Sequence, residues 1–191
     1  FIPINQWNNG DFDGESYFLT EEGGILAIPE LDTGIGWGAT AGFSFTYPIR
    51  MVNFVTKSSF SVSQSFHRGE FLGDPMDASF LMFSLDWACG LRIFDRVTFL
   101  LSCGWDIPYF LIIKNGYING TEHSDLTYWD FQGLNGGVGL EIKVFENFSL
   151  TVQGEHRLID FGTGKFDDGS LMVEYFGTAT WHGKLGFLYY L

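Results

Sequence analysis

The stretch that decides the fold is Ile35-Gly36-Trp37-Gly38-Ala39-Thr40-Ala41-Gly42-Phe43-Ser44-Phe45-Thr46-Tyr47. Apolar side chains occupy its odd positions, and glycine, serine or threonine occupies its even positions. Because successive side chains of a β-strand point to opposite faces, this period of two predicts a strand with one apolar and one small, polar face. The stretch is also longer than the ~5–6 residues of an ordinary strand.

The same alternation recurs in six further runs, at residues 54–67, 81–93, 97–109, 134–144, 148–158 and 171–191. The connections alternate between short ones, near residues 48–53, 95–96 and 146–147, and longer ones, at 67–77, 113–127 and 159–170. Short turns at one end and long loops at the other are typical of an up-and-down antiparallel β-barrel that crosses a membrane.

Strand parity sets the expected number of strands. If the chain both starts and ends on the side of the short turns, the number of strands must be even. The seven runs therefore require one additional strand, which predicts an eight-stranded barrel. The stretch available for the extra strand is roughly Ser16–Ile28, and residues 1–15 are expected to be irregular. We therefore expect residues 1–191 to form a single all-β domain, an antiparallel transmembrane barrel.

Composition narrows the function classes. The 191 residues contain 10 Lys and Arg against 23 Asp and Glu, a net charge of −13, without a basic patch that could meet a nucleic acid. The longest uncharged run, Thr33–Ile49, contains several glycines and Pro48 and is shorter than the ~20 residues of a membrane-spanning helix. The two cysteines lack a CxxC spacing, and no cofactor or metal is expected.

Two kinds of barrel fit the alternation, a soluble one such as a lipocalin and a membrane-spanning one. The polar face here is built from Gly, Ser, Thr and Ala rather than from the Lys, Glu and Asp of a solvated face. The chain ends in a polar residue, a glycine and two alternate hydrophobic residues, Lys184, Gly186, Tyr189 and Leu191. This ending resembles the terminal β-signal that the barrel-assembly machinery recognises, which favours the membrane barrel.

With these features the chain resembles the small eight-stranded outer-membrane β-barrel proteins, the A, X and W types of Gram-negative bacteria, over about Ile35–Leu191 and in pattern rather than identity. Members of that family commonly end in Phe, from which Leu191 departs. The resemblance implies a monomer in the bacterial outer membrane that contacts lipid and lipopolysaccharide. It also implies a structural, adhesion or ligand-interaction role through the outer loops, and no nucleic-acid partner.

Two other functions stay open. The Gly and Ser lining of the hairpin over residues 35–67 would suit a narrow pore or small-molecule conduit. A lipid-A-modifying enzyme would need a histidine, a serine and an acid near the outer rim, and the nearest sets are His67 with Ser65 and Glu70, or His156 with Glu155. Their spacing is generic. His67 is better explained as an ordinary strand-end residue, and His156 falls on the apolar parity of its strand, so no catalytic residue is assigned.

Matching the apolar faces of the hairpin around Asp95 and Arg96 pairs residues whose numbers add to 192. This register places Cys89 opposite Cys103 on the lipid face, where directly opposed Cβ atoms lie ~4.5–5.5 Å apart. The pair is either a cross-strand disulfide in an oxidising compartment or two small hydrophobic residues.

The same register places Asp86 opposite Asp106 inside the barrel. Glu155, Arg157 and His182 lie at a similar height on other strands, and a second charged layer is expected lower down, built from Lys57, Arg92, Glu141, Lys143 and Lys184. One interpretation is a proton relay, a hydrolytic site or a cation site. The other is a salt-bridge network that fills a lumen just wide enough for side chains.

A weak calcium candidate lies near the N-terminus. Asp11 and Asp13 occupy alternate positions before Gly14, as in the first half of a calcium-binding loop, but Thr20 stands where the closing Glu belongs. The alternative is a solvated turn.

Overall fold

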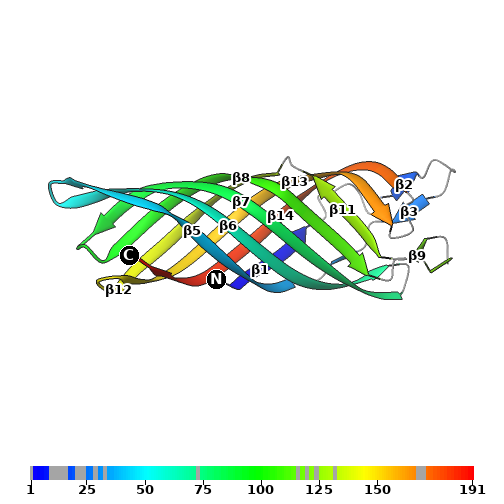
Figure 1. Cartoon of the computed structure of the whole chain (residues 1–191), viewed down its shortest axis with the longest axis horizontal. Helices are drawn as coiled ribbons and strands as arrows, with labels where there is room; N and C mark the ends of the chain where they lie inside the picture. The colour runs from blue at the N-terminus through cyan, green and yellow to red at the C-terminus, as the bar shows by residue number, and fades with distance from the viewer. Residues whose placement is uncertain are drawn as a thin grey trace.

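The computed structural model describes residues 2–8, 17–19, 25–27, 30–31, 34–71, 74–114, 117–118, 121–122, 125–130, 133–166 and 171–191. Seven long strands form its frame: β5 (Gly34–Ile49), β6 (Val52–Phe71), β7 (Asp74–Ile93), β8 (Val97–Lys114), β12 (Gly133–Phe145), β13 (Phe148–Phe166) and β14 (Leu171–Tyr189). They form one curled sheet and run obliquely to the long axis of the molecule (Figure 1).

Each long strand pairs antiparallel with the long strand that follows it in the chain, so the all-β, up-and-down topology expected from the sequence is confirmed. The described residues include no helix that is long and apolar enough to cross a membrane. The structure also describes seven shorter strands: β1 (Ile2–Asn8), β2 (Tyr17–Leu19), β3 (Ile25–Ala27), β4 (Glu30–Leu31), β9 (Tyr117–Ile118), β10 (Thr121–Glu122) and β11 (Leu126–Asp130).

The N-terminal region differs from its expectation. Within Ser16–Ile28, where one long strand was expected, β2 and β3 pair with each other in a separate two-stranded sheet. The strand beside β14 and β5 is instead β1, inside the segment expected to be irregular. Sheet edges recruit partners through backbone N–H and C=O groups, so a strand can form there without side-chain alternation.

The strands also continue into the segments expected to be long loops. β6 and β7 stay paired as far as Phe71 and Asp74, and β11 extends the line of β12 by pairing with both β8 and β13. The alternation fades there although the pairing persists. Backbone pairing does not require an apolar face. Alternation of apolar and polar residues therefore marks only that part of a strand whose two faces have different surroundings.

The two faces of the sheet have opposite character. Large apolar side chains of the outer face are exposed, for example Phe43 at 75% and Leu101 at 64%. The buried inner face carries mostly polar and charged residues, among them Asp106 and Arg157, each 0% exposed. Because charged residues are almost never fully buried unless they are paired, the inner face requires ion pairs.

The register of the β7–β8 hairpin differs from the expected one by two residues. Cys89 lies opposite Leu101, and Cys103 lies opposite Trp87. The turn begins at the bond from the Arg96 N–H to the Ile93 carbonyl (3.1 Å), with positive φ at Phe94 and Asp95. A shift of two residues leaves every side chain on its original face, so the apolar pattern could not detect it.

The register generates a cross-linking prediction. Replacing Leu101 by Cys in a Cys103→Ser background should allow a disulfide to Cys89 under mild oxidation, since these positions are directly opposed. The unaltered chain, whose two cysteines are free and not opposed, should retain two titratable thiols under the same oxidation. Thiol counting on the refolded protein checks both, and rapid loss of both thiols in the unaltered chain alone would restore the register expected from the sequence.

Candidate functional site

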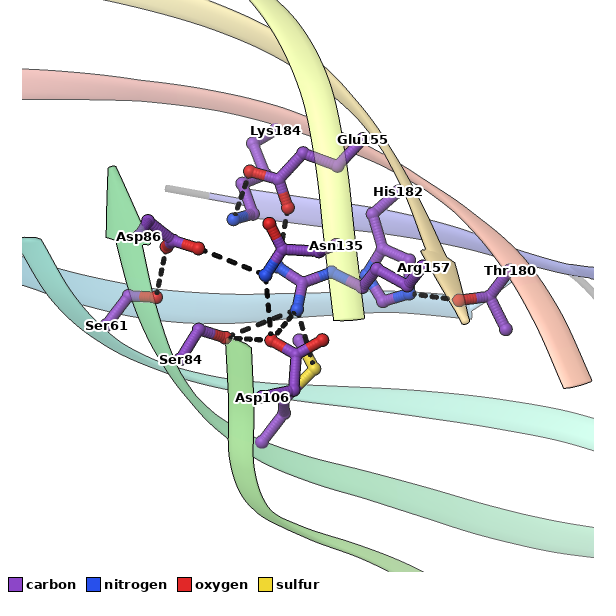
Figure 2. A network of polar contacts seen from close by, with 11 residues as sticks. Ser61, Ser84, Asp86, Asp106, Asn135, Glu155, Arg157, Thr180, His182 and Lys184 are labelled. Atoms are coloured by element: carbon purple, nitrogen blue, oxygen red, sulfur yellow. Dashed lines mark hydrogen bonds and ion pairs between the residues drawn. The ribbon is translucent and has the colours of Figure 1, made fainter. Parts of the chain in front are cut away.

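The centre of the inner face is Arg157 of β13, whose guanidinium is fully buried. Its Nη1 donates to Asp106 Oδ1 on β8, and its Nη2 donates to Glu155 Oε2 at 2.5 Å (Figure 2). Nη1 also donates to Ser84 Oγ on β7 at 3.2 Å. One cation from β13 thus binds groups on β7 and β8, strands separated from it in the sheet by β12.

Two neighbours extend this centre. Lys184 of β14 donates to Glu155 Oε1 at 2.7 Å, so Glu155 lies between two cations. Asn135 of β12 donates from Nδ2 to Asp106 Oδ1 and to Asp86 Oδ1, each at 3.1 Å. Asp86 and Asp106 are therefore joined through an amide, whereas the sequence register placed them directly opposite each other; Asp86 in fact pairs with Gly104.

Hydroxyl groups supply the remaining bonds to the acids. Ser84 donates to Asp106 Oδ1 at 2.6 Å, and Ser61 donates to Asp86 Oδ2 at 3.3 Å. Both serines are buried, and Ser61 belongs to a run of buried inner serines on β6 with Ser63 and Ser65. These small residues of β6 leave space for the long side chains of β13 and β14.

The charges of this network nearly cancel. Three carboxylates, from Asp86, Asp106 and Glu155, meet the two cations Arg157 and Lys184. Among these contacts, the acids of Asp106 and Glu155 touch a cation directly, while Asp86 accepts from the neutral amide of Asn135 and the hydroxyl of Ser61. Burial of charge is tolerated only where such pairing exists, so the arrangement is suited to filling the interior.

His182 belongs to the same region but not to the ion pairs. Its Nε2 lies 2.8 Å from Thr180 Oγ1, while its buried Nδ1 has no hydrogen-bond partner among the described residues. A second buried histidine, His67, lies 2.9 Å through Nε2 from Ser65 Oγ. Of the five residues expected to share one level, the structure joins Asp106, Glu155 and Arg157 directly, attaches Asp86 through Asn135 and leaves His182 beside Thr180.

The second charged layer lies nearer the short turns. Glu141 is ion-paired with Lys57, accepts from Tyr190 Oη at 2.9 Å and lies 3.8 Å from Arg92 Nη2. Lys57 also donates to Tyr190 Oη at 2.7 Å. Lys184, which was expected in this layer, belongs instead to the network of Arg157. It pairs with Gln153 in the β13–β14 register, and its side chain reaches diagonally to Glu155.

The other candidates are dispersed. His156 lies on the outer parity of β13, with its ring edge-on to Trp181 at 4.6 Å, so it does not turn toward Glu155 on the inner face. Asp11 and Asp13 lie outside the described residues, as does the side chain of Glu70. Within the part of the chain that is described, no three His, Cys, Asp or Glu side chains are grouped to hold a metal ion.

The four residues of the C-terminal pattern, Lys184, Gly186, Tyr189 and Leu191, lie in different surroundings. Lys184 is buried and ion-paired, and Gly186 pairs with Thr151 inside the sheet. Tyr189, the last residue of β14, and Leu191, beyond the end of that strand, are both exposed. Their alternation is therefore that of any strand with a polar inner face and an apolar outer face.

Asn135, Ser84 and Met82 were missed as members of the network. Asn135 occupies an inner, odd position of β12, and Ser84 and Met82 occupy inner, even positions of β7. Strand parity could have placed all three inside, but their contact with Arg157 or the acids depends on the stagger between strands. Met82 Sδ lies 3.0 Å from Arg157 Nη1.

No protein-family model matches the chain, and no curated protein matches its sequence.

The network makes a stability prediction. Replacing Arg157 by Met leaves the buried acids Asp106 and Glu155 without its guanidinium, and removing one partner of a buried ion pair costs about 3–5 kcal/mol of unfolding free energy. The matched control is Arg68→Met, because Arg68 pairs with Asp77 at 3.9 Å on the exposed surface, where such a pair contributes about 0–1 kcal/mol. Urea unfolding of the refolded proteins should separate the two variants, and equal losses would contradict a structural role of Arg157.

A second prediction concerns Gly104. A Cβ at this position would lie 2.3 Å from Asp86 Oδ1, 2.7 Å from the backbone carbonyl oxygen of Leu85 and 2.8 Å from Asn135 Nδ2. Gly104→Ala should therefore crowd the β7 backbone, displace the amide that joins the two acids and lower the unfolding free energy by about 1–3 kcal/mol. Gly154→Ala is the control, since its Cβ would meet nothing within 4 Å. Equal stabilities of the two variants would show that the Asp86–Asn135 contact is dispensable.

Proposed function

We propose that this chain is a transmembrane β-barrel of a bacterial outer membrane. The observation that carries the proposal is the inverted polarity of the sheet, with charged residues buried inside and large apolar residues exposed outside. In water the exposed apolar face would be an aggregation surface, but against lipid chains it is the favoured one. Backbone groups inside a bilayer must all be paired, which the antiparallel ladder satisfies from strand to strand.

The same requirement favours closure with eight strands. An open sheet would leave the outer edges of β5 and β14 unpaired in lipid. β1 offers the partner, since it pairs with β14 from Ile2 to Asn8 and with β5 through Ile4 and Asn5. We therefore propose β1, β5, β6, β7, β8, β12, β13 and β14 as the eight strands of the barrel.

The length of the strands supports a role outside the membrane. A tilted strand crosses the hydrocarbon layer with ~9–11 residues, whereas β6 and β7 have 20 residues each. The excess lies at the end away from the short turns, where β9 and β10 form an additional hairpin. We propose that this extended end displays the outer loops to ligands, host molecules or neighbouring envelope components.

The filled interior supports a scaffold rather than a conduit. Arg157, Asp106 and Glu155 meet across the inner face and are fully or almost fully buried, as are the apolar residues Phe80 and Met82. An eight-stranded barrel has an interior just wide enough for side chains to fill. The proposed function is therefore structural or interactive, and the barrel itself conducts no solute.

The membrane assignment predicts a strong effect of charge on the outer face. Leu101→Arg, at an exposed outer-face position of β8 that pairs with Val138 of β12, should lower the unfolding free energy in lipid vesicles by about 2–4 kcal/mol. Phe94→Arg, at the exposed tip of the short turn, should have an effect close to zero because the turn lies outside the hydrocarbon layer. Equal effects, or a folded chain that stays soluble without detergent, would contradict membrane insertion.

The scaffold assignment predicts that the refolded protein produces no conductance steps above leak in planar bilayers. Arg157→Met is the informative comparison, because it removes the side chain that crosses the inner face. Regular conductance steps from the unaltered protein would replace the scaffold with a pore. Altered lipid A in cells that produce the protein, abolished by His67→Ala, would replace it with a membrane enzyme.

A further inference from the structure

A polar cavity of about 140 Å³ lies at the short-turn end of the inner face. Its lining comes from strands far apart in the sheet: Ser44 and Thr46 belong to β5, Arg92 to β7 and Lys143 to β12. A water molecule takes about 30 Å³ in the liquid, so this space suits several waters or one small organic molecule. It is separate from the buried network of Arg157, with which it shares no lining residue.

The negative charge of Glu141, which lines the cavity, is already neutralised within the protein. The Glu141 carboxylate is ion-paired with Lys57 and accepts a hydrogen bond from Tyr190. Its buried oxygens are thus engaged by neighbours within the protein. Glu141 and Lys57 cancel each other's charge, so they contribute little to what the cavity attracts.

Two cations remain less well compensated. Arg92 reaches the engaged Glu141 only at 3.8 Å, and Lys143 forms no ion pair within the described residues. The one other charged group of the lining, Glu146, lies exposed in the turn between β12 and β13. With Glu141 and Lys57 cancelled, Arg92, Lys143 and Glu146 leave one net positive charge, in a chain whose total is −13.

From this geometry we propose that the cavity binds the carboxylate group of a small molecule, held by Lys143 and Arg92. Hydrogen bonds from cationic donors to a carboxylate are about twice as strong as neutral ones. The hydroxyl groups of Ser44 and Thr46, on the β5 wall, supply further donors. One net positive charge matches a monoanion better than a phosphate dianion, which Glu146 would also repel. This site is additional to the proposed scaffold role and depends on neither the outer loops nor conduction.

The test uses the full chain refolded in detergent micelles, with sodium acetate as the probe and sodium chloride as the ionic-strength control. Acetate should cause saturable shifts of the amide NMR signals of residues 44, 92 and 143, with an affinity in the millimolar range. Lys143→Gln should weaken binding by about tenfold or more, the loss of one charge-assisted contact. Lys143→Arg keeps the charge and should bind acetate nearly as well as the unaltered chain.

The control is Lys114→Gln, which removes the same charge from an exposed position at the opposite end of β8 and should leave acetate binding unchanged. Absence of saturable shifts in the folded protein would overturn the site. Equal weakening by Lys143→Gln and Lys114→Gln would reduce it to general charge attraction. Tighter binding of inorganic phosphate at pH 8 than of acetate would overturn the carboxylate assignment. Each of these results can occur whether or not the barrel acts as a scaffold.

Discussion

The contact of Arg157 with Asp106 and Glu155 is the interaction on which the interior depends. A fully buried guanidinium is very unfavourable by itself, and it is stable here because two carboxylates from different strands meet it. Its position constrains the neighbouring strands. β7 must offer a serine near it, β12 an amide beside the same acid, and β8 a glycine where a larger residue would push Asp86 and Asn135 apart.

The division of residue sizes around the sheet follows from this constraint. Long charged side chains project from β13 and β14, and the serines at positions 61, 63 and 65 line the inner face of β6. Long side chains on both β6 and the β13–β14 pair would not fit in the interior. Small side chains on all of these strands would leave a water-filled channel. The pairing of large with small residues lets a narrow interior be filled by polar groups that bind one another. Within the described residues, Asp106 Oδ2, Asn135 Oδ1 and Arg157 Nε have no hydrogen-bond partner, so the bonding of the network is incomplete. At the short-turn end the filling is looser, and there the cavity beside Lys143 opens.

Prediction from the sequence was most successful where it depended on parity. The assignment of Glu155 and Arg157 to the inner face, and of Cys89 and Leu101 to the outer face, followed from alternation and agrees with their exposure. Prediction was poorer where a backbone contact alone decided the outcome. The alternation of Ile2 and Ile4 stops at Gln6 and is too short to mark residues 2–8 as a strand, and the strand ends beyond residue 67 pair without alternation. The place of Lys184 was also missed, because height along a strand depends on the stagger of its neighbours.

The sequence by itself thus determined which residues share a face, since the period of two survives any even shift between strands. It also determined that the interior would be polar and the exterior apolar. Only the tertiary structure decided which residues touch. It separated Cys89 from Cys103, placed Asn135 between Asp86 and Asp106, and moved Lys184 to Glu155. The physical reason is that ion pairs and hydrogen bonds act over about 3 Å, whereas a register shift of two residues moves a side chain by about 7 Å.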